Sequence, residues 1–143
     1  MHSPIGDLTI SSENSALVAL DWGWARDQAS DDLLERAKSQ LDAYFDGKAE
    51  TFDLPLAPAG TDFQQRVWTH MNSISYGKTI SYGEIAKVLN SAARAVGMAC
   101  GANPIPIIIP CHRVLAVNGM GGYSGEGGVE TKVALLRLER VLL

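Results

Sequence analysis

The stretch Asn103–Val114, which reads NPIPIIIPCHRV, carries the strongest chemical signal in this sequence. An apolar run between prolines delivers Cys111 to a fixed position, and His112 follows it directly. A thiol presented next to an imidazole is a candidate nucleophile, because the thiolate is the reactive form and a nearby base or cation favours it. A buried structural cysteine followed by a surface histidine fits the same spacing, so the stretch by itself leaves both interpretations open.

The composition indicates one globular domain, with room for a small N-terminal subdomain. The chain has 143 residues, of which 46% are hydrophobic and 20% are charged. The longest apolar run, Ile105–Pro110, is too short to cross a bilayer, and the N-terminus lacks the features of a signal peptide. The only two cysteines, Cys100 and Cys111, do not make a disulfide framework. We therefore expect a cytoplasmic protein with no membrane partner.

Charge is distributed unevenly along the chain, whose formal net charge is -4. Residues 1–60 hold eleven acidic and four basic side chains, a net of −7, whereas residues 61–143 hold five acidic and eight basic ones, a net of +3. Such asymmetry can mark a polyanion-binding domain beside an acidic one. The modest positive surplus in the second part, which contains Cys111, permits DNA binding without demanding it.

Sequence patterns predict a mixed N-terminal part. Residues 5–10 and 16–21 alternate in polarity around a polar turn, which predicts a β-hairpin. Residues 31–45 carry apolar side chains at helical spacing, and residues 52–54 suit a further strand. The prolines and glycine of residues 55–60 form a connector. We expect an N-terminal α/β subdomain over residues 1–58 and a second domain over residues 59–143.

The second domain is predicted to be mainly helical. Helices are expected from about residue 61 to 73, from 81 to 89, from 92 to 102 and from 129 to 143. The two central helices are separated by a tight turn, which suggests a helix-turn-helix. The second of them is rich in alanine and glycine, which suits either close approach to a partner or tight core packing. Glycines crowd residues 119–128, as in a mobile or ligand-facing loop.

Taken together, these segments resemble the O6-alkylguanine-DNA alkyltransferases, and the organisation is similar to the stand-alone bacterial type. The resemblance is carried by residues 109–115 (IPCHRVL), 92–97 (AARAVG), 103–106 (NPIP), 81–86 (SYGEIA), 63–68 (FQQRVW), 121–125 (GGYSG), 130–132 (ETK), 135–139 (LLRLE), 3–6 (SPIG) and 40–47 (QLDAYFDG). It covers nearly the whole chain. It implies an α+β fold, in which a ribonuclease H-like N-terminal α/β subdomain precedes a mainly helical domain with the helix-turn-helix.

The resemblance also implies an activity. Members move the alkyl group of O6-alkylguanine in DNA, and of O4-alkylthymine, to their own cysteine in a single turnover. They bind double-stranded DNA through the minor groove and flip the damaged base out of the helix. The implied partner is duplex DNA containing O6-alkylguanine, and the implied enzyme is a monomer without a cofactor. No paired ligand spacing suggests a metal site.

Roles at the reacting centre follow from the resemblance. Cys111 is the expected nucleophile, and His112 the base that deprotonates it through an ordered water. Glu139 would hold the other imidazole nitrogen, the orienting role of a triad's third member. Tyr82 would donate a proton or hydrogen bond to the leaving purine. Asn103 would tie the DNA-binding helix to the cysteine segment.

Further residues are expected to contact DNA or the flipped base. Arg94 would enter the duplex and replace the extruded guanine, since a planar guanidinium can stack and hydrogen-bond. The neighbouring small residues expected in the minor groove are Ala93, Ala95 and Gly97. Tyr82 is also expected to contact the DNA. The residues expected to surround the substrate are Val114, Tyr123, Ser124 and Trp68. Arg113 is expected to brace the structure.

Several positions depart from the family pattern. The stretch Leu89–Ala92 is about two residues shorter than usual, which puts the angle between two helices and the aim of Arg94 in question. Cys100 and Ala102 replace polar residues, and Ser75 replaces a proline.

Two other functions remain open on the sequence. One is a module that recognises alkylated bases with an inactive Cys111. The other is a cysteine hydrolase using Cys111, His112 and Glu139, which the prolines before the cysteine disfavour, because such a nucleophile gains from a helix N-terminus.

Overall fold

The N-terminal part of the computed structural model is a hairpin with a helix packed on it. The structure describes residues 1–24, 31–117, 119–123, 125 and 127–142. Strand β1 (Leu8–Glu13) pairs antiparallel with β2 (Ala16–Trp22). The turn residues Asn14 and Ser15 have φ of 50° and 63°, the left-handed pair that two-residue hairpins require. The predicted hairpin is therefore confirmed.

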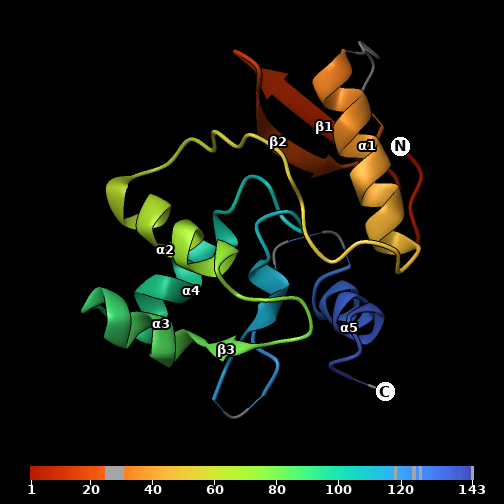
Figure 1. The fold of residues 1–143 in the computed structure, drawn as a ribbon. Helices are drawn as coiled ribbons and strands as arrows, with labels where there is room; N and C mark the ends of the chain where they lie inside the picture. Colours follow the sequence, from red (N-terminus) through yellow and green to blue (C-terminus); the bar gives the residue numbers. More distant parts are fainter. Residues whose placement is uncertain (25–30, 118, 124, 126, 143) are drawn as a thin grey trace.

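Helix α1 (Asp32–Phe45) follows the hairpin and packs against it (Figure 1). Asp31 caps it by accepting a hydrogen bond of 2.7 Å from the Leu34 amide. The strand predicted at residues 52–54 is absent from the structure. Side chains of α1 bind its backbone instead: Gln40 exchanges two hydrogen bonds with Asp53, and Arg36 donates to the Asp53 carbonyl. A single bridge joins Leu56 to Leu17.

Three helices gather on the other side of the molecule (Figure 1). They are α2 (Asp62–Asn72), α3 (Tyr82–Leu89) and α4 (Ala93–Gly101). Thr61 and Gln64 form a capping box at the start of α2, and Ser81 caps α3. All three agree with the predicted helices to within one or two residues.

The shortened turn between α3 and α4 closes on a left-handed residue. Asn90 ends α3 with φ 53° and ψ 51°, and Ala92 begins α4 in an extended conformation. Asparagine tolerates this region better than other residues with a Cβ. The helix pair thus forms without the glycine and proline that are usual in this turn, and α3 still packs directly on α4.

The segment from the end of α4 to Arg113 runs through the middle of the molecule (Figure 1). Residues Cys111–Arg113 make one turn of 3₁₀ helix, η1, rather than extended chain. Two short strands, β3 (Ile80–Ser81) and β4 (Val114–Leu115), pair in parallel just after it. Each strand has only two residues, so alternation of polar and apolar residues in the sequence could not have revealed it.

The last helix, α5 (Val129–Leu138), is shorter than predicted. It ends because Arg140 takes a left-handed conformation with φ 64°, while Arg140 and Val141 donate to the carbonyls of Arg137 and Leu136 at 3.0 and 2.9 Å. This is the Schellman pattern of helix termination. It leaves Glu139 at the C-cap, buried in the interior.

Among the described residues, no helix combines the length and apolarity needed to cross a bilayer. The domain boundary at residues 58 and 59 stays a prediction.

The conformation of Asn90 generates a stability prediction. Asn90→Ala should lower the free energy of unfolding by about 1 kcal/mol, because alanine is disfavoured in the left-handed region, whereas Asn90→Gly should change it by a few tenths at most. Urea denaturation of both variants measures the effect. Ser91→Ala is the control, since Ser91 has no positive φ. Equal stabilities of the alanine and glycine variants would contradict the argument.

Candidate active site

A cavity of about 430 Å³ opens beside the cysteine. It collects residues from the start of α3, from α4, from η1 and from the glycine-rich loop before α5. The lining residues are Tyr82, Gly97, Cys100, Gly101, Cys111, Gly122 and Tyr123. Its size lies in the range of ordinary small-molecule pockets.

Cys111 is almost completely buried, with 5% of its surface exposed. Burial raises the pKa of its thiol to about 11, although a hydrogen bond with Asn103 and the charge of Lys132 act in the opposite direction. The resting side chain is therefore a thiol at neutral pH. Its reaction as a nucleophile requires a base that takes the proton.

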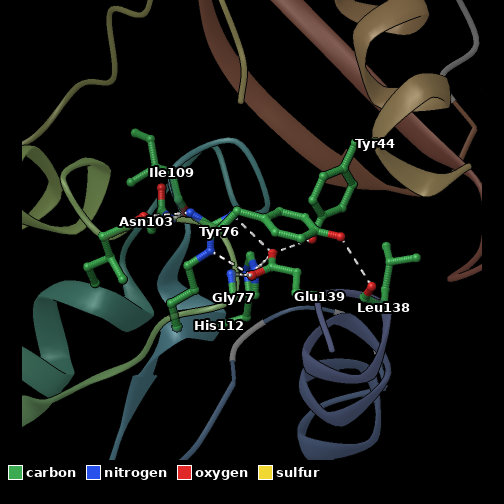
Figure 2. Close-up of polar contacts among 10 residues, drawn as sticks. Tyr44, Tyr76, Gly77, Asn103, Ile109, His112, Leu138 and Glu139 are labelled. Atoms are coloured by element: carbon green, nitrogen blue, oxygen red, sulfur yellow. Dashed lines mark hydrogen bonds and ion pairs between the residues drawn. The ribbon is translucent and has the colours of Figure 1, made fainter. Parts of the chain in front are cut away.

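His112 is in the state that such a base needs. Its Nε2 lies 2.6 Å from Oε2 of Glu139, and both side chains are fully buried (Figure 2). Burial lowers the pKa of the imidazole despite the carboxylate beside it, so the ring is neutral. The Glu139 contact assigns the proton to Nε2. Nδ1 has no hydrogen-bond partner among the described residues, which leaves its lone pair able to accept a proton.

Glu139 is the centre of a buried network. Beyond His112, its carboxylate accepts hydrogen bonds from Arg113 at 2.8 and 3.0 Å, from the Tyr44 hydroxyl at 2.6 Å and from the Gly77 amide at 3.3 Å. Burial alone would raise the pKa of this carboxyl, but the bonds from His112 and Arg113 lower it to about 2. Glu139 is thus an anion that fixes the orientation of His112.

Tyr44 brings the N-terminal part of the chain into this network. It lies on α1 and reaches Glu139 across 95 positions of sequence (Figure 2). Burial and the adjacent carboxylate raise the pKa of its phenol, which therefore stays a donor. The sequence indicated only that Tyr44 belongs to the apolar stripe of its helix, a pattern that does not reveal a distant partner.

Arg113 braces this region, as expected. Besides Glu139, it donates to the Ile74 carbonyl at 2.7 Å and lies 5.8 Å from the centre of the Tyr76 ring. It is absent from the residues that line the cavity.

Asn103 connects α4 to the cysteine segment (Figure 2). Its side chain donates to the Ile109 carbonyl and accepts from the Ile105 amide, both at 2.9 Å. These bonds fold residues 103–109 into a fixed loop that ends at Pro110 and Cys111. The position of the nucleophile is thereby coupled to the end of α4.

Tyr82 and Lys132 lie together at the cavity. Burial, followed by the neighbouring Cys100 and Cys111, raises the pKa of Tyr82 to about 12, so its phenol is a neutral donor. Lys132 on α5 is fully buried and lies 3.5 Å from the Tyr82 hydroxyl. Its ammonium donates to the carbonyls of Val114, Met120 and Gly122 at 2.7, 2.6 and 3.0 Å.

Sequence reasoning missed the role of Lys132. The available signal was its place three and four residues before the buried Leu135 and Leu136, on the inner face of the last helix. A lysine at such a position needs several hydrogen-bond acceptors, and the glycine-rich loop provides two of them.

The structure distributes the remaining predicted residues differently. Tyr123 lines the cavity, whereas Val114 is buried and contributes its carbonyl to Lys132. Ser124 lies outside the described residues. Trp68 is packed in the core at 2% exposure and donates to the Ala99 carbonyl at 2.8 Å, so the expected contact with substrate is corrected to a bridge between α2 and α4.

Helix α4 presents one face to solvent. Ala93 and Arg94 are exposed, Ala95 and Gly97 are half-buried, and the opposite face is buried. The basic side chain predicted to enter DNA therefore lies on the surface, on the helix whose Gly97 lines the cavity that contains Cys111. Within the described part of the chain, no three His, Cys, Asp or Glu side chains gather as metal ligands would.

Comparison with known proteins identifies the family. Residues 1–58 match the ribonuclease-like domain of 6-O-methylguanine DNA methyltransferases, and residues 62–141 match their DNA binding domain. The chain belongs to the 6-O-methylguanine DNA methyltransferase family. The resemblance found in the sequence and the α+β fold expected from it are thus confirmed.

Relatives in this methyltransferase family cover nearly the whole chain. The methylated-DNA–protein-cysteine methyltransferase of Mycobacterium bovis is 46% identical over 153 residues, covering 98% of this chain and 90% of its own length. That of Methanosarcina acetivorans is 42% identical, covering 96% and 94%. The crystal structure of Mycobacterium tuberculosis OGT in complex with DNA superimposes with a TM-score of 0.86 at 47% identity, covering 98% and 90%. An O6-methylguanine DNA methyltransferase from Methanococcus jannaschii gives 0.69 at 31% identity, covering 95% and 89%.

The Glu139 network generates a pH-dependent prediction. Glu139→Gln should destabilise the fold by about 3 kcal/mol at pH 7, because it leaves the buried Arg113 without its counter-ion. The folded carboxyl has a pKa of about 2 against an ordinary 4.5. Its ionised form therefore stabilises the fold above pH 4.5, and this contribution is lost as the pH falls through about 2.

Urea unfolding between pH 7 and pH 2 tests this prediction. The difference in free energy of unfolding between wild type and Glu139→Gln should shrink as the pH falls below about 4.5. Glu130→Gln, which changes an exposed acid on α5, is the control and should match wild type throughout. A difference that stays constant across this range would refute the assignment of the ionised state.

Proposed function

We propose that this chain repairs alkylated DNA by transferring the alkyl group of O6-alkylguanine to Cys111 in a single turnover. The observation that supports it best is the Cys111–His112–Glu139 arrangement at the edge of a cavity. A neutral imidazole, oriented by an ionised carboxylate, belongs to the residue that directly follows a thiol in need of deprotonation. Relatives named methylated-DNA–protein-cysteine methyltransferase support the same reaction.

The first step is removal of the thiol proton. His112 and Cys111 are adjacent in sequence, and an ordered water between Nδ1 and Sγ carries the proton from sulfur to nitrogen. The imidazolium that forms donates from Nε2 to Glu139, whose carboxylate stabilises the positive charge. Arg113 and Tyr44 hold this carboxylate in place as the charge appears.

The second step is an in-line displacement at the alkyl carbon. A bond forms between that carbon and Sγ of Cys111, the bond from the carbon to O6 breaks, and its electron pair passes to the purine. Tyr82 donates a proton or hydrogen bond to the departing base, and the nearby Lys132 ammonium stabilises charge that develops on its oxygen. The product is a thioether, which this site has no group to cleave, so each chain reacts once.

DNA binding prepares the substrate. A base stacked in a duplex cannot reach a buried thiol, so the guanine must leave the helix, at a cost of a few kcal/mol. We infer that α4 enters the minor groove and that Arg94 fills the gap.

O4-alkylthymine presents an alkoxy group on a similar ring edge and fits the same chemistry. One chain supplies all these groups, which supports action as a monomer, and a reducing compartment such as the cytoplasm keeps Cys111 reactive.

Intact-protein mass spectrometry tests the proposed reaction. Incubation with excess duplex containing O6-methylguanine should add one methyl group per chain, and peptide mapping should place it on Cys111. Cys111→Ala should abolish the gain and still bind the lesion. Retained binding by wild type with no mass change would favour the alternative function, a non-catalytic module that recognises alkylated bases, and continuous turnover would favour a hydrolase.

The role of Arg94 is tested separately. Arg94→Ala should slow alkyl transfer from duplex DNA by about tenfold or more, because nothing then compensates for the extruded base. Its reaction with free O6-benzylguanine should stay within about twofold of wild type, since that substrate needs no flipping. Arg137→Ala, which removes an exposed arginine from α5, controls for the lost charge. Equal losses on both substrates would exclude a base-replacing role.

A further inference from the structure

The exposed face of α4 carries one large apolar side chain that the mechanism leaves unused. Met98 is 71% exposed, whereas Val96 and Ala99 beside it are buried. It lies four residues after Arg94, so the two side chains are neighbours one turn apart on the same face. Arg94 is the only charged residue of this helix, and its outer face therefore combines one cation with one apolar group.

Met98 lies in α4 between two glycines that line the cavity. Gly97 precedes it directly, Gly101 follows three residues later, and both line the cavity together with Cys111. A Cβ built on either glycine meets no described atom within 4 Å apart from its chain neighbours and the backbone of α4 itself, so packing against other elements does not demand their small size. The space they leave open is available to a molecule that approaches α4 from outside.

We propose that Met98 is a second DNA contact, an apolar wedge that packs in the minor groove against the nucleotide next to the extruded one. The inference rests on the proposed function, because it takes the occupant of this face to be duplex DNA. Apolar side chains in the minor groove pack between base steps and on sugars, and they open a step at the cost of its stacking. Methionine suits this contact, since its flexible thioether adapts to an irregular surface.

The division of labour between the two side chains follows from their chemistry. Arg94 attracts the phosphate backbone and occupies the vacated position, whereas Met98 gains only from leaving water. Side chains of a helix lean toward its N-terminus, so Met98 leans toward the turn that carries Arg94. It thus supports the distorted step beside the gap and favours the flipped state over the stacked one.

Binding measurements on a non-reacting background test the proposal. Cys111→Ser holds the lesion without accepting the alkyl group, and Met98→Ala added to it should weaken binding to duplex containing O6-methylguanine by about tenfold. The slope of log affinity against log salt should stay unchanged, because no charge is lost, whereas Arg94→Ala should reduce it by about one. Met98→Leu should keep most of the affinity.

Matched controls separate this contact from other effects. Val129→Ala removes another exposed apolar side chain, from α5, and should leave duplex binding unchanged. The single variant Met98→Ala, which retains Cys111, should react normally with free O6-benzylguanine and keep the melting temperature of wild type. Unchanged duplex affinity would refute the proposal, and a parallel loss on the free base would show that Met98 acts on the fold. Failure of wild type itself to accept an alkyl group would instead overturn the proposed function.

Discussion

The buried carboxylate of Glu139 is the interaction on which the rest of the structure depends. It joins His112 and Arg113 from the cysteine turn, Tyr44 from α1 and the backbone at Gly77. A buried anion is costly unless each of its lone pairs is satisfied, and here donors from three separate segments satisfy it. The same bonds that make burial tolerable also orient the His112 imidazole, so the stability of the fold and the proposed chemistry are coupled at one residue.

The electrostatics of the site set the protonation state of each group in it. Burial holds Cys111 protonated, His112 neutral and Tyr82 protonated, while the network holds Glu139 ionised. Each group is therefore in the state that the transfer consumes: a proton to give, a base to take it and a donor for the leaving purine. A thiol with a raised pKa is also protected from stray electrophiles in water. This protection suits a protein that reacts once.

Much of the local structure was predictable from the sequence. The hairpin and four of the helices follow from alternation and helical periodicity. The Cys111–His112 pair was equally visible, because it lies within one short motif. The strand predicted at residues 52–54 does not form, because Gln40 and Arg36 of α1 hydrogen-bond to the backbone of Asp53 instead. The predicted length of α5 was wrong because a left-handed conformation at Arg140 has no clear signature in the sequence.

The sequence by itself determined where the hairpin and most of the helices form and which cysteine is the candidate nucleophile, since these depend on neighbours a few positions apart. Only the tertiary structure decided what surrounds that nucleophile. The bond from Tyr44 to Glu139 spans 95 positions, and Lys132 finds its carbonyl acceptors in a separate loop. The inward placement of Trp68 likewise depends on how α2 meets α4. Such contacts depend on how whole elements pack, which no local pattern of residues specifies.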